Sequence, residues 1–560
     1  MVSNLPLCYG KTGLSVIYYI SVLKSIIVEY VVTIGGDFVG RQVSIGAQDF
    51  ASLIENNCFY VDKSSFIRDW WEGKDSVTLI TRPRRFGKSL LISTLDSYFS
   101  GDKELFKGLA IEMLETEWIK YPVLHFDMSM AKYHEEQNLH AALNFMLGQY
   151  EAQYGLETDK TSRAYGTRLT AIILKASQQT GRKVVVLIDE YDAPLLDTMV
   201  DDATFQLMRN TMRDFYSPLK ACDAYLQFVF LTGITKFSQL SIFSELNNIN
   251  NISMDNAYSG ICGITKTEVL SNFKDELAEM SANLYITIDE LLERLKQKFD
   301  GYHFSKNSED IYNPFSLLNA LQDNALDNYW FTSGTPTHLA EQIYKYKIDP
   351  RTFDDGFAAT TEMFDVPTET ASSPIPILYQ AGYLTIKNYR ERGNSYILGY
   401  PNEEVRQGFT KCLMPYYTKQ GIDKNDTFLL NFTDALYDNN IDMALSLMRA
   451  FMSSIPYDAE KQNELHYRTI IYLVFRIATP YFVSCEERSA AGRSDVVVET
   501  DEAVYVFEFK LDGSVDEALR QIDDKGYLVP YSAKGKKLYK VGVNFDNQLR
   551  TIAKWKVVEG

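Results

Sequence analysis

Residues 77–91 read Val77-Thr78-Leu79-Ile80-Thr81-Arg82-Pro83-Arg84-Arg85-Phe86-Gly87-Lys88-Ser89-Leu90-Leu91, which is an apolar strand, a loop and an amphipathic helix. The tripeptide Gly87-Lys88-Ser89 is typical of the end of a P-loop. In such a loop, backbone N–H groups at a helix N-terminus hold phosphate oxygens, the lysine neutralises phosphate charge and the serine hydroxyl binds Mg²⁺. The stretch predicts an α/β domain that binds ATP.

The loop departs from the usual pattern at one position. A standard P-loop has a glycine five residues before Gly87, where this chain has Arg82. We expect Arg82, Arg84 and Arg85 to reinforce anion binding, although the same arginines could also grip nucleic acid. A glycine at this position would let the backbone approach the phosphates closely. Because arginine replaces it, the sequence does not decide whether bound ATP is hydrolysed.

A second apolar strand supplies the acidic half of a nucleotide site. Residues 184–192 read Val184-Val185-Val186-Leu187-Ile188-Asp189-Glu190-Tyr191-Asp192. Asp189 is expected to hold Mg²⁺, directly or through water, and Glu190 to polarise the attacking water. A third apolar strand ends in Thr232, placed to sense the γ-phosphate. Each piece alone also arises by chance or as a solvated strand end; their order together predicts nucleotide binding.

A hairpin near the C-terminus gathers charged residues. Two β-branched and aromatic runs, 495–499 and 504–510, flank a four-residue polar turn. If Glu499 pairs with Val504, paired residue numbers sum to 1003, and Asp495 then faces Glu508 with Cβ atoms roughly 5 Å apart. Lys510, two residues after Glu508, points to the same face.

This cluster suggests metal-dependent phosphodiester cleavage. Two carboxylates so close repel each other unless a cation lies between them. Asp495 and Glu508 would hold Mg²⁺ or Mn²⁺, and Lys510 would orient water or stabilise charge. Glu464 is a further candidate ligand, or a helix-start acid favoured by the helix dipole. The alternative for Lys510 is an ordinary surface salt bridge with one acid.

Length, net charge and cysteine content limit the number of domains and the classes of protein that remain possible. At about 100–200 residues per domain, 560 residues make two to four domains. The net charge of −18 excludes a polycation that coats nucleic acid, although residues 461–560 carry equal numbers of basic and acidic side chains. The six cysteines are scattered without a CxxC pair, which favours a reducing, cytoplasmic location, and no Cys/His zinc spacing occurs.

Five regions can be outlined along the chain. Their ranges are 1–42, an appendage; 43–250, alternating strands and helices as in a parallel sheet; 251–345, helical; 346–460, mixed; and 461–560, helix, two strands, helix, strand. The apolar stretch 14–34 contains Lys24 and Glu29, whose mid-bilayer cost of roughly 2.5–3.5 kcal/mol each argues against a membrane span. A membrane anchor, an accessory strand or helix, and residues upstream of the true start stay open for the appendage.

Several motifs together resemble the AAA-ATPase-like family of bacteria and archaea, whose members carry a C-terminal nuclease-like domain of the PD-(D/E)XK superfamily. The resemblance covers about residues 43–555. It is carried by the stretches at 43–50, 59–63, 82–89, 187–192, 300–304, 312–316, 492–495 and 507–513. Arg82 is then a family trait, and Ser494 stands where the superfamily name has proline.

The resemblance implies a P-loop NTPase-like domain and a restriction-endonuclease-like α/β/α domain. It implies Asp495, Glu508 and Lys510 as the nuclease triad, with Gln521 on the following helix. The expected cofactors are ATP and Mg²⁺, and the expected partner is nucleic acid, DNA in preference to RNA. We therefore expect an ATP-dependent or ATP-gated nuclease. The alternatives are a nucleotide-dependent switch with an inactive nuclease fold and membrane-tethered signalling; self-association stays open.

Overall fold

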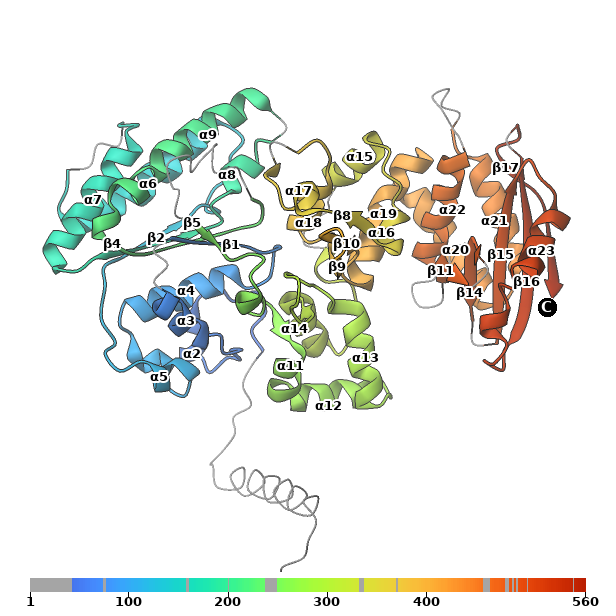
Figure 1. Ribbon diagram of the computed structural model, residues 1–560, viewed down its shortest axis with the longest axis horizontal. Coiled ribbons are helices and arrows are strands. Elements are labelled where there is room, and N and C mark those ends of the chain that lie inside the picture. The colour runs from blue at the N-terminus through green and yellow to red at the C-terminus, as the bar shows by residue number, and fades with distance from the viewer. Residues whose placement is uncertain are drawn as a thin grey trace, which may run out of the picture.

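The computed structural model describes residues 43–560 except 74–76, 158–160, 200, 237–248, 332–336, 369–370, 457–463, 479–482, 486–487, 490–491, 501 and 547. Three bodies follow one another from the N-terminal to the C-terminal part of the described chain (Figure 1). The apolar stretch 14–34 lies outside the described residues. Among the helices within them, none has both the length and the apolar composition needed to cross a bilayer.

The first body is built on a five-stranded parallel sheet, which confirms the predicted α/β fold class. The strand order is β2-β3-β4-β1-β5, and every neighbouring pair runs parallel. Strand β4 lies between β1 and β3, so the tips of three buried strands meet beside the phosphate loop, residues 82–89. The strands are β1 (Val77–Thr81), β2 (Val123–Asp127), β3 (Val184–Asp189), β4 (Leu226–Gly233) and β5 (Ile249–Asn251).

Helices cover both faces of this sheet (Figure 1). Alternate residues of β3 enter different cores because side chains alternate along a strand: Val185 and Leu187 belong to one, Val186 and Ile188 to the other. The first face is covered by α2 (Phe50–Glu55), α3 (Ser65–Gly73), α4 (Lys88–Phe99) and α5 (Ala110–Leu114). The second is covered by α6 (Glu136–Tyr154), α7 (Tyr165–Thr180) and α9 (Asp202–Tyr216), with the short α8 (Ala193–Leu196) and α10 (Pro218–Ala221) at its ends.

The middle of the chain is helical, as expected. Helix α13 (Ile288–Phe299) begins at the N-cap Thr287, carries acids in its first turn and lysines in its last, and so complements its own dipole. It shares a small core with α11 (Lys266–Asn272), α12 (Lys274–Asn283) and α14 (Pro314–Asp323). The two-stranded pair β6 (Ile264–Thr265) and β7 (Ile311–Tyr312) joins this core to the phosphate loop, since Gly263 N donates to Phe86 O.

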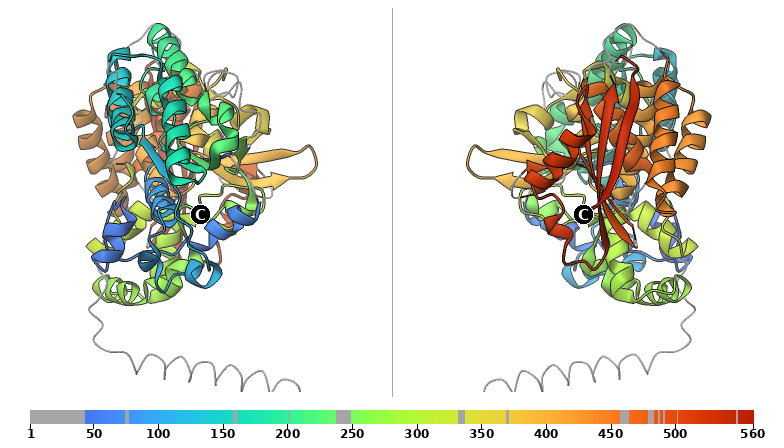
Figure 2. Two further views of the ribbon diagram at one scale, coloured as in Figure 1. Left: turned by 90° about the vertical axis from the view of Figure 1, so that its left-hand side faces the viewer. Right: turned by 90° about the vertical axis from the view of Figure 1, so that its right-hand side faces the viewer.

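Residues 346–460, called here the connecting region, combine a small antiparallel sheet with helices. The sheet has the order β8-β10-β9, and its β9–β10 hairpin projects from the body (Figure 2). The elements are α16 (Thr352–Asp355), β8 (Phe357–Ala359), α17 (Thr361–Phe364), α18 (Ile375–Gln380), β9 (Thr385–Arg390), β10 (Ser395–Gly399), α19 (Glu403–Thr418), α20 (Ile422–Tyr437) and α21 (Ile441–Ser453), preceded by α15 (Thr337–Lys345).

The C-terminal body is a mixed sheet of order β11-β14-β15-β16-β17 between two helical layers (Figure 2). Helix α23 covers one face, and α22 with α20 and α21 covers the other. The elements are α22 (Glu464–Ala478), β11 (Val483–Cys485), β12 (Arg488–Ser489), β13 (Gly492–Arg493), β14 (Val496–Glu499), β15 (Ala503–Leu511), α23 (Val515–Asp524), β16 (Lys537–Asp546) and β17 (Thr551–Glu559). This confirms the α/β/α expectation, and it adds β11 and β17 to the predicted strands of the sheet and the separate pair β12–β13.

The predicted hairpin register is confirmed. Glu499 pairs with Val504 and Val496 with Phe507, so each pair of residue numbers sums to 1003. The capping box expected at the start of α23 is also present, with Ser514 and Glu517 bonding each other's backbone N–H groups. The ladder therefore brings Asp495, one residue before β14, opposite Glu508.

Candidate nucleotide and nuclease sites

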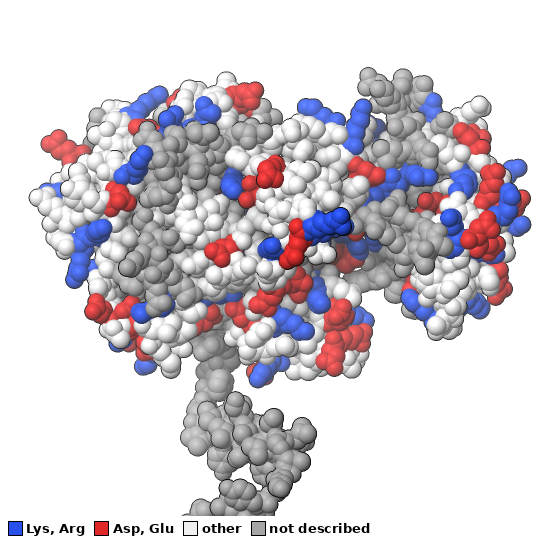
Figure 3. Space-filling model, viewed as in Figure 1, with Lys and Arg blue, Asp and Glu red and all other residues white. Residues whose placement is uncertain are grey.

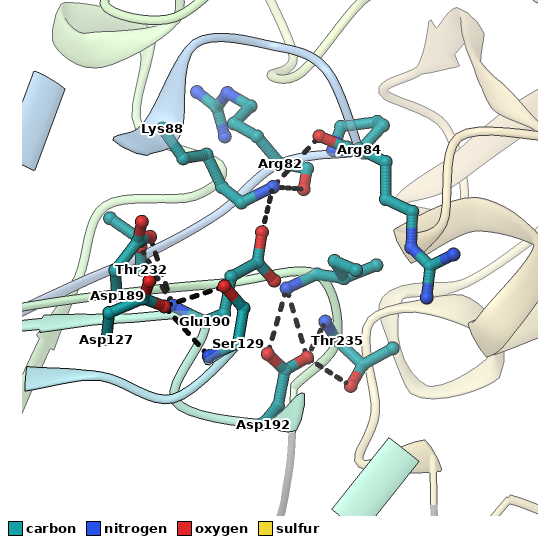
Figure 4. Close-up of polar contacts among 12 residues, drawn as sticks. Arg82, Arg84, Lys88, Asp127, Ser129, Asp189, Glu190, Asp192, Thr232 and Thr235 are labelled. Atoms are coloured by element: carbon teal, nitrogen blue, oxygen red, sulfur yellow. Dashed lines mark hydrogen bonds and ion pairs between the residues drawn. The ribbon is translucent and has the colours of Figure 1, made fainter. Parts of the chain in front are cut away.

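The phosphate loop has the local geometry that anion binding requires. Gly87 is the N-cap of α4 and adopts φ 85°, a left-handed conformation that glycine reaches at least cost. Lys88 is the first residue of α4 and is only 3% exposed. Its Nζ donates to the carbonyls of Arg82 and Pro83, each at 3.1 Å, and lies 3.3 Å from Glu190 Oε1 (Figure 4). The ammonium is thus held beneath the loop at the tip of β3.

Asp189, Glu190 and Thr232 meet at the tips of β3 and β4, as the sequence predicts. The hydroxyl of Thr232 makes a short hydrogen bond to the Asp189 carboxylate, which also accepts the Glu190 N–H at 3.0 Å (Figure 4). Glu190 has φ 50°, a conformation that is uncommon outside glycine and tends to occur at functional sites. The Thr232 hydroxyl therefore orients the Asp189 carboxylate.

Asp192 holds the two strand tips together, a role that the sequence reasoning did not assign. Its buried carboxylate accepts hydrogen bonds from Ile234 N at 3.0 Å, Thr235 N at 2.6 Å and Thr235 Oγ1 at 2.8 Å. Burial and the nearby charge of Glu190 raise the pKa of Asp192 to about 6. Tight backbone bonding of this kind keeps β4 in register with the acidic end of β3.

The three loop arginines have different surroundings, and Arg82 does not lie where its predicted role requires. Its guanidinium is buried in the core, donates to the carbonyls of Thr81, Ser253 and Tyr258, and lies 4.1 Å from the Phe304 ring centroid. It thus braces the loop from below, because a buried cation needs such partners. Arg84 and Arg85 are exposed and line the cavity described next.

A cavity of about 240 Å³ opens beside the phosphate loop. Its polar end is formed by Lys88, Ser89 and Glu190, and much of its remaining wall is apolar. The apolar lining includes Val43, Phe59, Val61, Ile264, Phe315 and Leu318. Phe315 lies in the first turn of α14 with its ring centroid 4.8 Å from the Arg85 guanidinium carbon. A charged end and an aromatic wall suit a nucleotide, with phosphates at the first and a base at the second.

Two motifs quoted from the sequence without a role contribute to this cavity. Phe315 belongs to the stretch 312–316, and Lys63 to the stretch 59–63. Lys63 lines the cavity and binds Glu268 at 2.6 Å and the Gly260 carbonyl at 2.7 Å, which ties the N-terminal segment to α11. The sequence identified both stretches as motifs, but only the structure shows that they line the cavity.

The charged residues of the C-terminal hairpin converge as predicted. Lys510 Nζ donates to Glu508 Oε1 at 2.9 Å and to Gln521 Oε1 of α23 at 2.5 Å. Asp495 Oδ2 accepts the Phe509 N–H at 2.8 Å, which fixes that carboxylate against the neighbouring strand. Glu508 is 2% exposed in a strand that is otherwise apolar from Ala503 to Phe509. Two acids, an ammonium and an amide therefore occupy one end of the hairpin.

Comparisons with known proteins agree with both constellations. A family model described as "Predicted AAA-ATPase" matches residues 44–243, and one described as "PD-(D/E)XK nuclease superfamily" matches residues 462–555. A protein of Azotobacter chroococcum mcd 1, described as "Uncharacterized protein in vnfD 5'region", is 32% identical over 532 residues, which cover 91% of this chain and 98% of the relative. The chain belongs to the AAA-ATPase-like family. Its C-terminal domain belongs to the PD-(D/E)XK nuclease superfamily.

The electrostatics of this PD-(D/E)XK domain fit a divalent cation. Burial, and next the charge of Asp495, raise the pKa of Glu508 to about 7; burial also raises the pKa of Asp495. Glu508 Oε2 is buried without a hydrogen-bond partner among the described atoms. A buried acceptor of this kind is costly unless something binds it, and carboxylate oxygens are ligands that Mg²⁺ and Mn²⁺ prefer.

A third acidic ligand is not established. The side chain of Glu464, the further candidate, lies outside the described residues, although the backbone of this residue begins α22. Within the described part of the chain, no group of three or more His, Cys, Asp or Glu side chains is arranged to hold a metal ion. In the described part of the chain, the two carboxylates that the hairpin brings together are those of Asp495 and Glu508.

Cation binding to this AAA-ATPase-like protein should depend on pH near neutrality. Because Glu508 in the metal-free protein keeps its proton below about pH 7, binding must release that proton. We expect the affinity for Mn²⁺ to fall by roughly tenfold per pH unit below 7 and to level off above it. Isothermal titration calorimetry at several pH values, in buffers of different ionisation enthalpy, measures both affinity and proton release. Binding that is independent of pH between 6 and 7, with no proton release, would contradict this expectation.

Proposed function

We propose that this protein binds ATP with Mg²⁺ at the phosphate loop and uses its C-terminal domain as a Mg²⁺-dependent nuclease, on DNA in preference to RNA. The observation that carries the nuclease half is the convergence of Asp495, Glu508 and Lys510, with Gln521 bonded to the lysine. An exposed surface salt bridge does not account for it, since Glu508 is buried and leaves one oxygen unpaired.

The residues have separate roles in this proposal. Asp495 and Glu508 would hold the cation, which when bound supplies a water molecule of lowered pKa for attack on phosphorus. Lys510 lies beside Glu508 and donates hydrogen bonds, so it can orient that water or stabilise charge on the phosphate. Gln521 accepts from Lys510 and thereby fixes the direction of the ammonium. Only Lys510 among these four brings a positive charge.

The nucleotide half rests on the cavity beside the phosphate loop. Lys88 and Ser89 line its polar end. Asp189 lies close by at the tip of β3. Ser89 and Asp189 are therefore the candidate Mg²⁺ ligands of the nucleotide site. Glu190 lines the same cavity and is the residue we assign to the attacking water in ATP hydrolysis. Arg84 and Arg85 are placed for phosphate contacts, whereas Arg82 acts through the loop backbone.

A chain of contacts links the phosphate loop to the nuclease domain and supports gating by nucleotide. Trp330 Nε1 donates to Arg84 O at 3.0 Å, and Trp330 N donates to Glu404 of α19 at 2.6 Å. In the same helix Arg406 lies 3.6 Å from Asp354, which pairs with Arg476 of α22 at 2.8 Å. Nucleotide phosphates that move Arg84 would therefore act on α19, which packs against α22.

The surface charge suits contact with a polyanion in the C-terminal domain better than elsewhere. The whole chain carries −18, but residues 461–560 are balanced between 15 basic and 15 acidic side chains. In Figure 3, blue and red side chains are interspersed over this end of the molecule. Nucleic-acid binding is then a matter of local basic groups and not of overall charge.

The decisive experiment incubates the full chain with plasmid and with single-stranded DNA, in Mg²⁺ or EDTA, with and without ATP. We expect cleavage in Mg²⁺ that ATP modulates, no cleavage in EDTA, and no cleavage by Glu508→Gln. Intact DNA binding with no cleavage in Mg²⁺ or Mn²⁺ would instead support a nucleotide-dependent switch. One observation favours such a switch: Lys510 Nζ donates to both Glu508 and Gln521. These two bonds occupy two of the three N–H donors of its ammonium group.

A further inference from the structure

The cavity beside the phosphate loop is walled by segments that lie far apart in the chain. Its polar end comes from the loop and the start of α4, whereas part of its wall comes from the middle region, defined here as residues 251–345. This part consists of residues 261–264, which lead into β6, and of Pro314, Phe315 and Leu318 in α14. All of it lies beyond residues 44–243, which the AAA-ATPase family model matches. A ligand that fills the cavity therefore contacts both the first body and the middle region.

The local sequence fixes the position of Phe315. Asn313 is the N-cap of α14, and its side-chain oxygen accepts the N–H groups of Phe315 at 3.0 Å and of Ser316 at 3.2 Å. Pro314 occupies the first helical position, which its fixed φ suits. The Ser316 hydroxyl donates to Glu404 of α19 at 2.7 Å, and both of these side chains are buried. The first turn of α14, and Phe315 with it, is therefore held in place.

The strand pair β6–β7 holds this turn beside the phosphate loop. Strand β7 ends at Tyr312, directly before the N-cap of α14, and pairs with β6. The N–H of Gly263, directly before β6, donates to the carbonyl of Phe86 at 3.1 Å. Gly263 adopts φ 93°, and a Cβ there would collide with the Ile311 side chain, so glycine is required for this close approach. Backbone contacts thus fix the placement of Phe315 relative to the phosphates' binding loop.

The wall around Phe315 suits a flat aromatic group. The Phe315 ring is half-buried and lines the cavity, with the Arg85 guanidinium carbon 4.8 Å from its centroid. Phe59 and Val61 continue the apolar wall and pack against the core that α11 to α14 share. The cavity of about 240 Å³ far exceeds the roughly 10–15 Å³ that one bound water needs. It therefore has room beyond its polar end for a group with an aromatic face, such as a base.

We propose that the nucleotide site is composite, with the phosphate loop holding the phosphates and Phe315 of the middle region stacking on the base. Phe315 is then a specificity-determining residue that favours purine nucleotides, because a purine offers a larger face for stacking than a pyrimidine does. The stretch 312–316 thereby gains a role, and the base lies one residue away from the bond between Ser316 and Glu404 of α19. This inference rests on the proposed binding of ATP.

The test is isothermal titration calorimetry on the full chain in Mg²⁺, with ATP, UTP and inorganic tripolyphosphate as probes. Tripolyphosphate carries the phosphates of a nucleotide without its base, so it reports on the polar end alone. The wild type should bind ATP roughly tenfold more tightly than UTP. Phe315→Ala should raise Kd for ATP by roughly tenfold and leave Kd for tripolyphosphate unchanged, whereas Phe315→Tyr keeps the ring and the ATP affinity. Tyr285→Ala, which removes a 96% exposed aromatic side chain of the same region, is the matched control and should change neither Kd.

The outcomes distinguish base stacking from ATP binding itself. Phe315→Leu, which keeps apolar bulk without the ring, replaces Phe315→Ala if a thermal melt shows that the alanine variant unfolds. Unchanged ATP affinity in the variant would refute base stacking while ATP binding stands, and so would an equal loss of affinity for ATP and tripolyphosphate. Equal affinity of the wild type for ATP and UTP would refute the assigned specificity. If the wild type binds neither ATP nor tripolyphosphate, the proposed nucleotide site fails as well.

Discussion

Replacing Lys510 with alanine is expected to reduce DNA cleavage by roughly 10²- to 10⁴-fold while leaving the fold intact. The ammonium bonds Glu508 at 2.9 Å and Gln521 at 2.5 Å, and its loss removes the only cation of the hairpin cluster formed with Asp495. At 27% exposure, the side chain can be removed without opening a core cavity. The effect should therefore fall on the rate and not on stability.

The domain itself offers a matched control. Lys540 on β16 also reaches α23, binding Asp523 at 2.9 Å, but it lies away from the acidic pair. Lys540→Ala removes the same kind of strand-to-helix contact and should keep nearly full cleavage. Plasmid nicking followed on gels, with thermal melting of each variant, measures both properties. Equal cleavage by wild type and Lys510→Ala would rule out the assigned role.

The hairpin shows how far sequence reasoning reaches when the structure is local. A four-residue turn fixes the register of two strands, and the register fixes which side chains face each other. Asp495, Glu508 and Lys510 could therefore be grouped from spacing alone, and the observed pairs of β14 and β15 agree. The strands β11 and β17 were not foreseen because their positions depend on pairing with distant segments.

Burial and long-range packing account for what the sequence did not reveal. Arg82 reads as one of three loop cations, but nothing in the local pattern shows that its guanidinium is enclosed by the carbonyls of Ser253 and Tyr258. The role of Phe315 in the cavity wall likewise depends on α14 packing beside the phosphate loop.

We expect the affinity for ATP to depend strongly on Lys88, as the rate of DNA cleavage is expected to depend on Lys510. Lys88→Ala should weaken ATP binding by roughly 100-fold, because charge-assisted hydrogen bonds to phosphate oxygens are lost at a buried position. This ammonium contacts two backbone carbonyls and the Glu190 carboxylate. Phosphate oxygens would compete for it and release Glu190 toward the water that it is proposed to polarise.

Isothermal titration calorimetry with ATP and Mg²⁺ measures the loss, and Lys107→Ala, an exposed lysine of the same body, serves as the control. If nucleotide gates the nuclease, Lys88→Ala should also remove the effect of ATP on plasmid cleavage while leaving the ATP-independent rate unchanged. Loss of ATP binding with ATP-modulated cleavage retained would mean that the ATP effect arises at a second site. Unchanged ATP affinity in Lys88→Ala would instead rule out the role assigned to Lys88 in binding phosphate.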